Sequence, residues 1–385
     1  MDYQYVEDKA SLDLLCERLA KAEVLAIDTE FVRTRTLYPK LGLLQVYDGN
    51  ELALIDPVTI EDLSPFWQLL TNDKIVKVLH ACSEDLEVFL HSGSTETNQC
   101  KPVNLIDSQI VMSFLGHGLS MGYAAMVKHY TGVELDKSES RTDWLKRPLT
   151  VKQLDYASAD VEYLYQIYPQ MIKDINEKGW LEQALQESQS LIEKKCLPID
   201  ENTLYKNIKM NWRLNPKQLN TLKYLTAWRY LQAKQRDISL GFVVKDNTLV
   251  GLAQSLPTSV EAMSKIEGVE VRDIKHKGKT LLGVMRQAQS VKESDYPKKI
   301  TRLDNYPHYK SLYKLIKSFI QETAEANGLT PDNLASKRQI NQFLTWHFNL
   351  NDARKSSIPV ELIHGWRLAL FGEELQALIE QQGNV

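Results

Sequence analysis

Apolar runs and polar clusters alternate through the first half of the chain. The aliphatic run at 24–27 ends in Asp28-Thr29-Glu30, a pattern typical of a buried central strand. Residues two apart on a strand point to the same face, so Asp28 and Glu30 are predicted to direct two carboxylates into one space while Thr29 faces away. Two like charges held so close are costly unless a cation lies between them. The pattern therefore indicates a candidate site for a hard divalent cation.

The elements that follow predict a mixed sheet. A helix over 10–21, with Ser11 as its N-cap, precedes the first strand. The turn Asp48-Gly49-Asn50 joins two further strands as a hairpin. We expect strands over 41–47, 52–56, 75–80 and 104–107, and helices over 61–71, 83–90 and 154–164. An antiparallel meander followed by alternating strands and helices indicates an α/β domain whose mixed sheet is flanked by helices.

Composition limits the class of protein. The chain has 385 residues, of which 43% are hydrophobic and 25% charged, which is ordinary for two or three globular domains. No apolar run approaches the ~20 residues that a membrane-spanning helix needs, and the N-terminus lacks the features of a signal peptide. The four cysteines show neither CxxC spacing nor a pairing pattern. We therefore expect a cytoplasmic protein without a zinc site and without a membrane partner.

Charge is distributed unevenly along the chain. Residues 1–205 carry 19 Lys and Arg against 33 Asp and Glu, a balance of −14, whereas residues 206–300 carry 18 against 8, a balance of +10. Residues 301–385 carry 9 of each sign. The asymmetry suggests that the first part gathers metal ions and the middle part attracts a polyanion. The alternative is a basic helical domain whose charge serves only its solubility.

Three further polar residues are candidates for the same site. Asp85 lies in the first turn of a predicted helix that leaves a strand, where α/β sheets commonly place their active sites. An acid there can also simply complement the helix dipole. Tyr156 and Asp160 are four residues apart and share one face of a predicted helix. They form either an ordinary helix pair or a hydroxyl that orients water beside a metal-bound carboxylate.

Taken in order, these residues resemble a known set of motifs. Asp28-x-Glu30, then Asp85, then Tyr156-x-x-x-Asp160 are similar to the three exonuclease motifs of the four-carboxylate 3′→5′ exonucleases, in their tyrosine-bearing branch. The resemblance implies that Asp28, Glu30 and Asp160 bind the ion that activates water, with Asp28 bridging to a second ion. Asp85 would hold the second ion through water, and Tyr156 would position the attacking water. Without cations, such a cluster raises its own pKa values, so metal affinity should fall at low pH.

A second stretch narrows the resemblance to one family. Residues 142–149, Thr-Asp-Trp-Leu-Lys-Arg-Pro-Leu, continue into 153–161 in a way that resembles the ribonuclease D signature. The resemblance covers residues 1–200. It implies a ribonuclease H-like fold and hydrolytic release of nucleoside 5′-monophosphates from an RNA 3′ end, with two divalent metal ions, Mg²⁺ or Mn²⁺.

Other residues near these motifs are weaker candidates for a role in the site. Thr29 and Gln45 are candidates for contact with the terminal nucleotide, because comparable positions serve so in related exonucleases; equally, they are polar residues on a sheet face. His80 ends a strand and is predicted to be a core or capping histidine. Trp144 and Arg147 are expected to support the helix that follows them rather than to touch RNA.

The second half of the chain loses its strand signals and is predicted to be helical. Two sets of residues carry a resemblance: Trp228-Arg229, Ala233, Asp237 and the stretch 242–246 in the first module, and residues 334–337 with Gly365-Trp366-Arg367 in the second. They resemble two HRDC modules, a basic one over 206–295 and a diverged, neutral one over 305–385. Lys275, Lys277 and Lys279 of the first module are candidates for contacts with RNA phosphates, and such binding should weaken steeply with salt. The second module is expected to serve packing more than binding.

The resulting hypothesis is a metal-dependent 3′→5′ exoribonuclease. We expect it to trim the 3′ ends of tRNA precursors and other small structured RNAs with single-stranded 3′ tails, and the modular layout would suffice as a monomer. Two alternatives stay open: a 3′→5′ exonuclease acting on DNA, because a catalytic core ignores the sugar unless something reads the 2′-hydroxyl, and a catalytically inactive RNA-binding scaffold.

Overall fold

A six-stranded mixed sheet organises the first half of the protein. The computed structural model describes residues 2–95, 98–136, 138–356 and 358–383. The strands are β1 (Gln4–Val6), β2 (Val24–Val32), β3 (Lys40–Tyr47), β4 (Leu52–Ile55), β5 (Val76–Leu79) and β6 (Leu105–Asp107), in the spatial order β1-β4-β3-β2-β5-β6. β2, β3 and β4 pair antiparallel, and the remaining neighbours pair parallel. The predicted mixed sheet is confirmed, with β2 near its centre.

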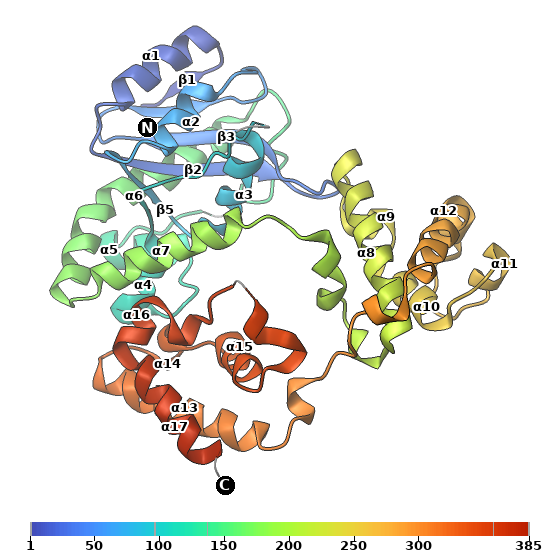
Figure 1. The fold of residues 1–385 in the computed structure, drawn as a ribbon. Coiled ribbons are helices and arrows are strands. Elements are labelled where there is room, and N and C mark those ends of the chain that lie inside the picture. Colours follow the sequence, from blue (N-terminus) through green and yellow to red (C-terminus); the bar gives the residue numbers. More distant parts are fainter. Residues whose placement is uncertain (1, 96–97, 137, 357, 384–385) are drawn as a thin grey trace.

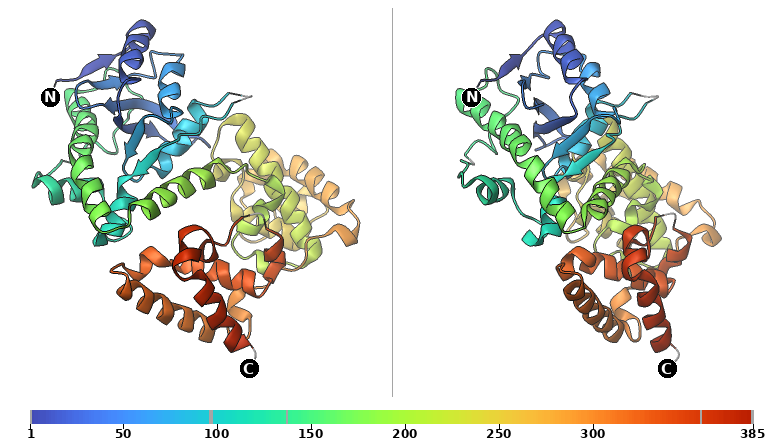
Figure 2. Two further views of the ribbon diagram at one scale, coloured as in Figure 1. Left: turned by 60° about the vertical axis from the view of Figure 1, so that its left-hand side comes forward. Right: turned by 90° about the vertical axis from the view of Figure 1, so that its left-hand side faces the viewer.

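Helices cover both faces of this sheet (Figure 1). They are α1 (Lys9–Leu19), α2 (Ser64–Leu70), α3 (Ser83–Ser92), α4 (Ser108–Met112), α5 (Tyr123–Thr131), α6 (Val151–Glu177) and α7 (Leu181–Cys196), with a π-helical turn at Ser113–His117. Alternate β2 residues divide between two cores: Leu25 and Ile27 pack with α1 and α2, whereas Ala26 packs with α6. In both views of Figure 2, α6 (green) runs alongside the sheet. Asp28 and Glu30 share the face of Ala26 and therefore point toward α6.

One local prediction was wrong, and one strand was missed. The N-cap of α1 is Asp8, whose carboxylate accepts a hydrogen bond from the Ser11 backbone N–H at 2.9 Å, so Ser11 lies inside the helix. The edge strand β1 was not predicted. Its three residues are too few to show an alternating pattern, and it is held by parallel pairing with β4.

The next part of the chain, residues 201–289, forms the first helical domain. It contains two 3₁₀ segments (Glu201–Asn207 and Asn211–Arg213) and the helices α8 (Pro216–Arg236), α9 (Leu240–Val243), α10 (Asp246–Ser255), α11 (Val260–Met263) and α12 (Val271–Gln289). Their apolar faces build a separate core.

A connection between β2 and β3, residues 33–39, reaches this domain and is here termed the arm. The backbone N–H groups of Leu37 and Tyr38 both donate to the Asp237 carboxylate at 3.1 Å, and the Ser239 N–H donates to the Arg35 carbonyl at 2.8 Å. Leu37 packs against the core of the first helical domain. The arm therefore joins the strand that carries Asp28 directly to the first helical domain.

The second helical domain comprises residues 309–383. After two short 3₁₀ turns in the connecting segment, Glu293–Asp295 and Leu303–Asn305, it contains α13 (Tyr309–Ala326), α14 (Pro331–Leu334), α15 (Lys337–His347), α16 (Gly365–Arg367) and α17 (Glu373–Gly383). Further 3₁₀ turns lie at Leu350–Lys355 and Glu361–Ile363, and a π-helical turn lies at Leu368–Gly372. Figure 1 shows this domain folding back beneath α7.

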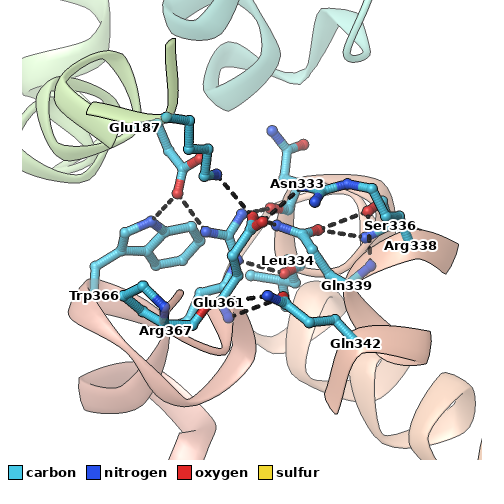
Figure 3. A network of polar contacts seen from close by, with 12 residues as sticks. Glu187, Asn333, Leu334, Ser336, Arg338, Gln339, Gln342, Glu361, Trp366 and Arg367 are labelled. Carbon is cyan, nitrogen blue, oxygen red and sulfur yellow. Dashed lines mark hydrogen bonds and ion pairs between the residues drawn. The ribbon is translucent and has the colours of Figure 1, made fainter. Parts of the chain in front are cut away.

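A buried polar network fixes the second helical domain to α7 (Figure 3). The Arg367 guanidinium pairs with the Glu187 carboxylate and donates to the carbonyls of Leu334 at 2.7 Å and Asn333 at 2.9 Å. The Trp366 indole N–H donates to the same Glu187 carboxylate at 2.7 Å. The expectation that this neutral module serves packing agrees with these contacts.

Apolar side chains complete the contact between the two domains. The Phe114 ring lies 5.6 Å from the Trp366 ring and 6.0 Å from the Trp180 ring, centroid to centroid. These side chains belong to one continuous core that runs from the α6 face of the sheet into the second helical domain. Among the described residues, none of the helices combines the length and apolar character that crossing a membrane requires.

Candidate active site

Three carboxylates from two elements meet at one point of the sheet. Asp28 and Glu30 come from β2, and Asp160 comes from α6, which packs across that strand. One carboxylate oxygen of each residue lies within 4.8 Å of those of the other two. A register shift between Glu30 and Phe31 in the β2–β3 pairing places an irregularity of the strand directly after the second carboxylate. The carboxylates predicted on the strand and the carboxylate predicted on the helix thus form one cluster.

The fourth carboxylate, Asp85, reaches the cluster from α3. It is the third residue of that helix and is 7% exposed. The Thr29 hydroxyl, on the opposite face of β2 from Asp28, donates a hydrogen bond to the Asp85 carboxylate. The Thr29 side chain is itself buried. The Thr29 hydroxyl thus orients Asp85, and its predicted contact with the terminal nucleotide stays a prediction.

Burial is the main cause of the raised pKa values in the cluster, and repulsion between the carboxylates adds to it at Asp28 and Glu30. Burial raises the pKa of Asp28 well above its usual range, and the charges of the three neighbouring carboxylates raise it further. Burial and nearby charges raise the pKa of Glu30 to about 9. Burial raises the pKa of Asp160 to about 7, and a hydrogen bond from Tyr156 opposes that rise. Burial raises the pKa of Asp85 to about 6, against the lowering effect of the Thr29 hydrogen bond.

The donor set fits a hard divalent cation. It consists of carboxylate oxygens alone, which Mg²⁺ and Mn²⁺ prefer. Within the described parts of the chain, no Lys or Arg charge offsets the raised pKa values of Asp28, Glu30 or Asp160. A cation would therefore remove a repulsion that these side chains otherwise relieve by holding protons.

Tyr156 lies one helical turn before Asp160 and is held by a tryptophan. Its hydroxyl bonds to the Asp160 carboxylate, and burial together with the nearby carboxylates raises the pKa of Tyr156, so the phenol stays protonated at neutral pH. The Trp144 ring, which is 1% exposed, lies 6.2 Å from the Tyr156 ring, centroid to centroid. Trp144 therefore supports the helix, as predicted.

Arg147 is also a supporting residue. Its guanidinium binds both oxygens of the Asp56 carboxylate at 2.6 Å and donates to the Gly42 carbonyl at 2.6 Å. These bonds tie the segment before α6 to the ends of β3 and β4. The prediction that Arg147 supports the terminal helix rather than touching RNA agrees with this geometry.

Gln45 lies beside the cluster on the neighbouring strand. It is directly opposite Asp28 in the β2–β3 register, so the two side chains share one face of the sheet. The Gln45 side chain is fully buried, and neither its amide oxygen nor its amide nitrogen has a partner among the described residues. A buried amide without a partner is costly, so Gln45 remains a candidate for a polar contact at the site.

Two residues around the cluster play supporting parts. His80 bonds to the Ser108 hydroxyl at 2.8 Å and to the Met121 carbonyl at 3.0 Å, which agrees with the predicted core or capping role. The Tyr123 hydroxyl donates to the backbone carbonyls of Ala159 at 2.9 Å and Asp160 at 2.6 Å. Tyr123 was not singled out in the sequence, because nothing near it in the chain indicates that it reaches the turn of α6 that carries Asp160.

The three lysines predicted to contact phosphates differ in their surroundings. All three lie on α12 of the first helical domain, where Lys275 and Lys279 are exposed. The Lys277 ammonium instead donates to the Asp273 carboxylate at 3.0 Å and to the Val243 carbonyl. Lys277 is therefore occupied within the domain, and Lys275 and Lys279 are the better placed for an external anion.

Comparisons with protein families agree with the three parts of the fold. The family described as 3′-5′ exonuclease matches residues 3–176, the HRDC domain family matches residues 218–285, and the family described as Ribonuclease D, C-terminal HRDC domain matches residues 307–375. These matches confirm the predicted class: a mixed-sheet domain followed by two all-helical HRDC domains.

Individual relatives span nearly the whole chain. The ribonuclease D of Cronobacter turicensis is 44% identical over 370 residues, covering 96% of this chain and 98% of the relative. The ribonuclease D of Escherichia coli K12 is 41% identical over 381 residues, covering 99% of both chains. The crystal structure of the latter, described as an exoribonuclease involved in structured RNA processing, superposes with a TM-score of 0.93 at 41% identity over 99% of both chains. A Bifidobacterium adolescentis protein, 20% identical over 98% of this chain and 97% of its own, shares the fold with a TM-score of 0.70.

Proposed function

The chain belongs to the ribonuclease D family of 3′→5′ exoribonucleases, and we propose that Asp28, Glu30, Asp85 and Asp160 carry its reaction with two divalent metal ions, Mg²⁺ or Mn²⁺. The observation that carries the proposal is the meeting of three carboxylates within 4.8 Å on β2 and α6, with Asp85 adjacent. When bound, the ions supply an activated water and charge stabilisation at the scissile phosphate. The reaction releases nucleoside 5′-monophosphates from the RNA 3′ end.

The four carboxylates have different roles in binding the two ions. Asp28, Glu30 and Asp160 would hold the ion that activates water, and Asp28 would also serve as a ligand of the second ion. Asp85 would hold the second ion through water, and the Thr29 hydrogen bond orients its carboxylate and lowers its pKa against the effect of burial.

Tyr156 and Gln45 act on the reactants rather than on the ions. The Tyr156 hydroxyl stays protonated beside Asp160 and orients the attacking water by a hydrogen bond. The buried Gln45 amide, without a partner within the described ranges, offers a polar contact to the terminal nucleotide or to a water molecule bound with it. Thr29 orients Asp85 and is a further candidate for contact with the terminal nucleotide.

RNA recruitment belongs to the first helical domain in this proposal. Residues 206–300 carry an excess of ten positive charges, and Lys275 and Lys279 face outward on α12, where they would bind phosphates. We propose as substrates tRNA precursors and other small structured RNAs with single-stranded 3′ tails. The proposal includes a monomer working in the cytoplasm, with an exonuclease domain over 1–200 and HRDC domains over 206–295 and 305–385.

Paired substitutions test the metal assignment. Asp28→Asn and Asp160→Asn should each abolish hydrolysis of a 5′-labelled RNA oligonucleotide while leaving its binding largely intact. Asp155→Asn is the matched control, because Asp155 lies on the same helix but is exposed. Near-normal turnover in either of the first two variants would show that the metal ligands are wrongly assigned. Equal loss of activity in Asp155→Asn would show that the effect is not specific to the cluster.

A further inference from the structure

One aromatic side chain stands apart from all others in the protein. Across the described residues, Phe242 is the only Phe, Tyr or Trp side chain with more than half of its surface exposed, at 58%. The neighbouring Val243 and Val244 are buried in the core of the first helical domain. The chain therefore buries the small apolar residues of this segment and presents its one large ring to solvent, the reverse of what burial alone favours.

The backbone around Phe242 is fixed, so the ring is presented rather than loosely attached. The Phe242 N–H donates to the Ser239 carbonyl at 2.9 Å at the start of α9. At the other end of α9, the Lys277 ammonium bonds to the carbonyls of Phe242, at 3.5 Å, and Val243. Lys277 thus holds α9 against α12, which explains why this lysine is not available to an external phosphate.

The domain that presents the ring is basic, because residues 206–300 carry an excess of ten positive charges. Lys277 contacts α9, whereas the exposed Lys275 and Lys279, two positions before and after it, lie on the other side of α12. Arg272 and His276 of the same helix are also exposed. An exposed ring on a domain with exposed cationic side chains is the combination that binds single-stranded nucleic acid, where bases stack on rings and phosphates meet lysine or arginine.

The ring also lies close to the junction with the exonuclease domain. Ser239, which accepts the Phe242 hydrogen bond, donates its own N–H to the Arg35 carbonyl of the arm at 2.8 Å. The arm continues directly from β2, which carries Asp28 and Glu30. Phe242 is therefore separated from the arm by one hydrogen-bonded turn, on the side of the first helical domain that adjoins the catalytic domain.

We propose that Phe242 is a base-stacking platform for the single-stranded part of the RNA substrate. This inference rests on the proposed recruitment of RNA by the first helical domain and adds a contact to the bases. Stacking is tolerant of sequence because every base has a π face, which suits an enzyme that removes successive nucleotides.

Binding measurements on the full chain test the proposal. A 5′-labelled single-stranded RNA oligonucleotide is titrated in EDTA, which prevents metal-dependent hydrolysis, at several salt concentrations. We expect Phe242→Ala to raise Kd by about 5- to 150-fold, the factor that corresponds to one stacked base, without changing the slope of log Kd against log salt. Lys275→Ala combined with Lys279→Ala should reduce that slope by about 1.4, because each phosphate contact on a single strand contributes about 0.7.

Matched controls separate stacking from loss of apolar surface. Phe242→Trp should restore binding, since the indole also stacks, and Leu231→Ala should leave Kd unchanged, since Leu231 is 50% exposed on α8 of the same domain. An oligonucleotide with abasic sites should bind wild-type protein and Phe242→Ala equally.

The outcomes distinguish base stacking on Phe242 from the recruitment of RNA by the first helical domain. If the lysine variant weakens binding and Phe242→Ala does not, the platform is overturned and recruitment stands. If neither changes Kd, recruitment by the first helical domain fails as well, and the platform with it. Equal weakening of the abasic and the normal oligonucleotide by Phe242→Ala would also overturn stacking.

Discussion

Replacing Arg367 by methionine should destabilise the attachment of the second helical domain far more than a similar change nearby. The Arg367 side chain is 7% exposed, pairs with Glu187 and donates to two backbone carbonyls. Methionine keeps the apolar stem but leaves these acceptors without their donor. In the same network, Arg338 binds Glu361 at 2.7 Å with its own side chain 69% exposed, which makes Arg338→Met the matched control.

The expected loss of stability in each variant follows from how deeply the ion pair is buried. Breaking a buried ion pair costs ~3–5 kcal/mol, and leaving a buried acceptor unpaired costs ~1–3 kcal/mol. The Glu187 side chain is 22% exposed and keeps its bond from Trp366, and methionine restores some packing, so we expect a total loss of about 3–5 kcal/mol for Arg367→Met. The exposed Arg338 pair contributes at most about 1 kcal/mol.

Urea unfolding provides the assay. The midpoint shift of each variant, multiplied by the slope of the unfolding free energy against urea concentration, gives the loss of stability. Arg367→Met should shift the midpoint several times more than Arg338→Met. Similar shifts in the two variants, or a loss below about 1 kcal/mol for Arg367→Met, would refute the view that this buried network holds the domain.

Three further predictions concern the catalytic site. In EDTA, the free energy of unfolding should fall as pH rises from about 4 toward 9. The reason is that Glu30, with a pKa of about 9, holds a proton in the folded state that the unfolded chain releases near pH 4. Thermal unfolding should show a weaker dependence of stability on pH for Asp28→Asn than for the wild type. Thr29→Val should raise the pKa of Asp85 above about 6 and so increase the Mn²⁺ concentration that gives half-maximal rate at pH 7. A Mn²⁺ titration at pH 8.5 should show a smaller increase. Tyr156→Phe should lower kcat by ~10²-fold with little change in KM, because the variant loses the hydroxyl that orients the attacking water. An unchanged kcat in steady-state assays would remove Tyr156 from the mechanism.

Local sequence patterns were sufficient to predict the framework of the site. Asp28 and Glu30 follow an aliphatic run, and their common face is a property of any strand. Tyr156 and Asp160 are one helical turn apart, which is a property of any helix. The hairpin of β3 and β4 was predicted from its turn residues. Each of these features depends on residues that are close together in the chain.

Contacts between distant residues could not be predicted in this way. Thr29 and Asp85 are 56 residues apart, and the pattern that correctly turned Thr29 away from Asp28 gave no sign that α3 would bring a carboxylate to it. Lys277 was grouped with its neighbours by charge alone, whereas the packing of α9 against α12 decides that it bonds internally. The role of Glu187 required knowledge of a partner 180 residues away.

Digestion of matched 5′-labelled RNA and DNA oligonucleotides, each with a single-stranded 3′ tail, tests the central claim most directly. We predict a ladder that shortens from the 3′ end of the RNA with Mg²⁺ or Mn²⁺, does not form in EDTA and is lost in Asp28→Asn. Equal degradation of the DNA would contradict selectivity for RNA. Undiminished RNA degradation in EDTA would contradict the assignment of the carboxylate cluster as a metal site.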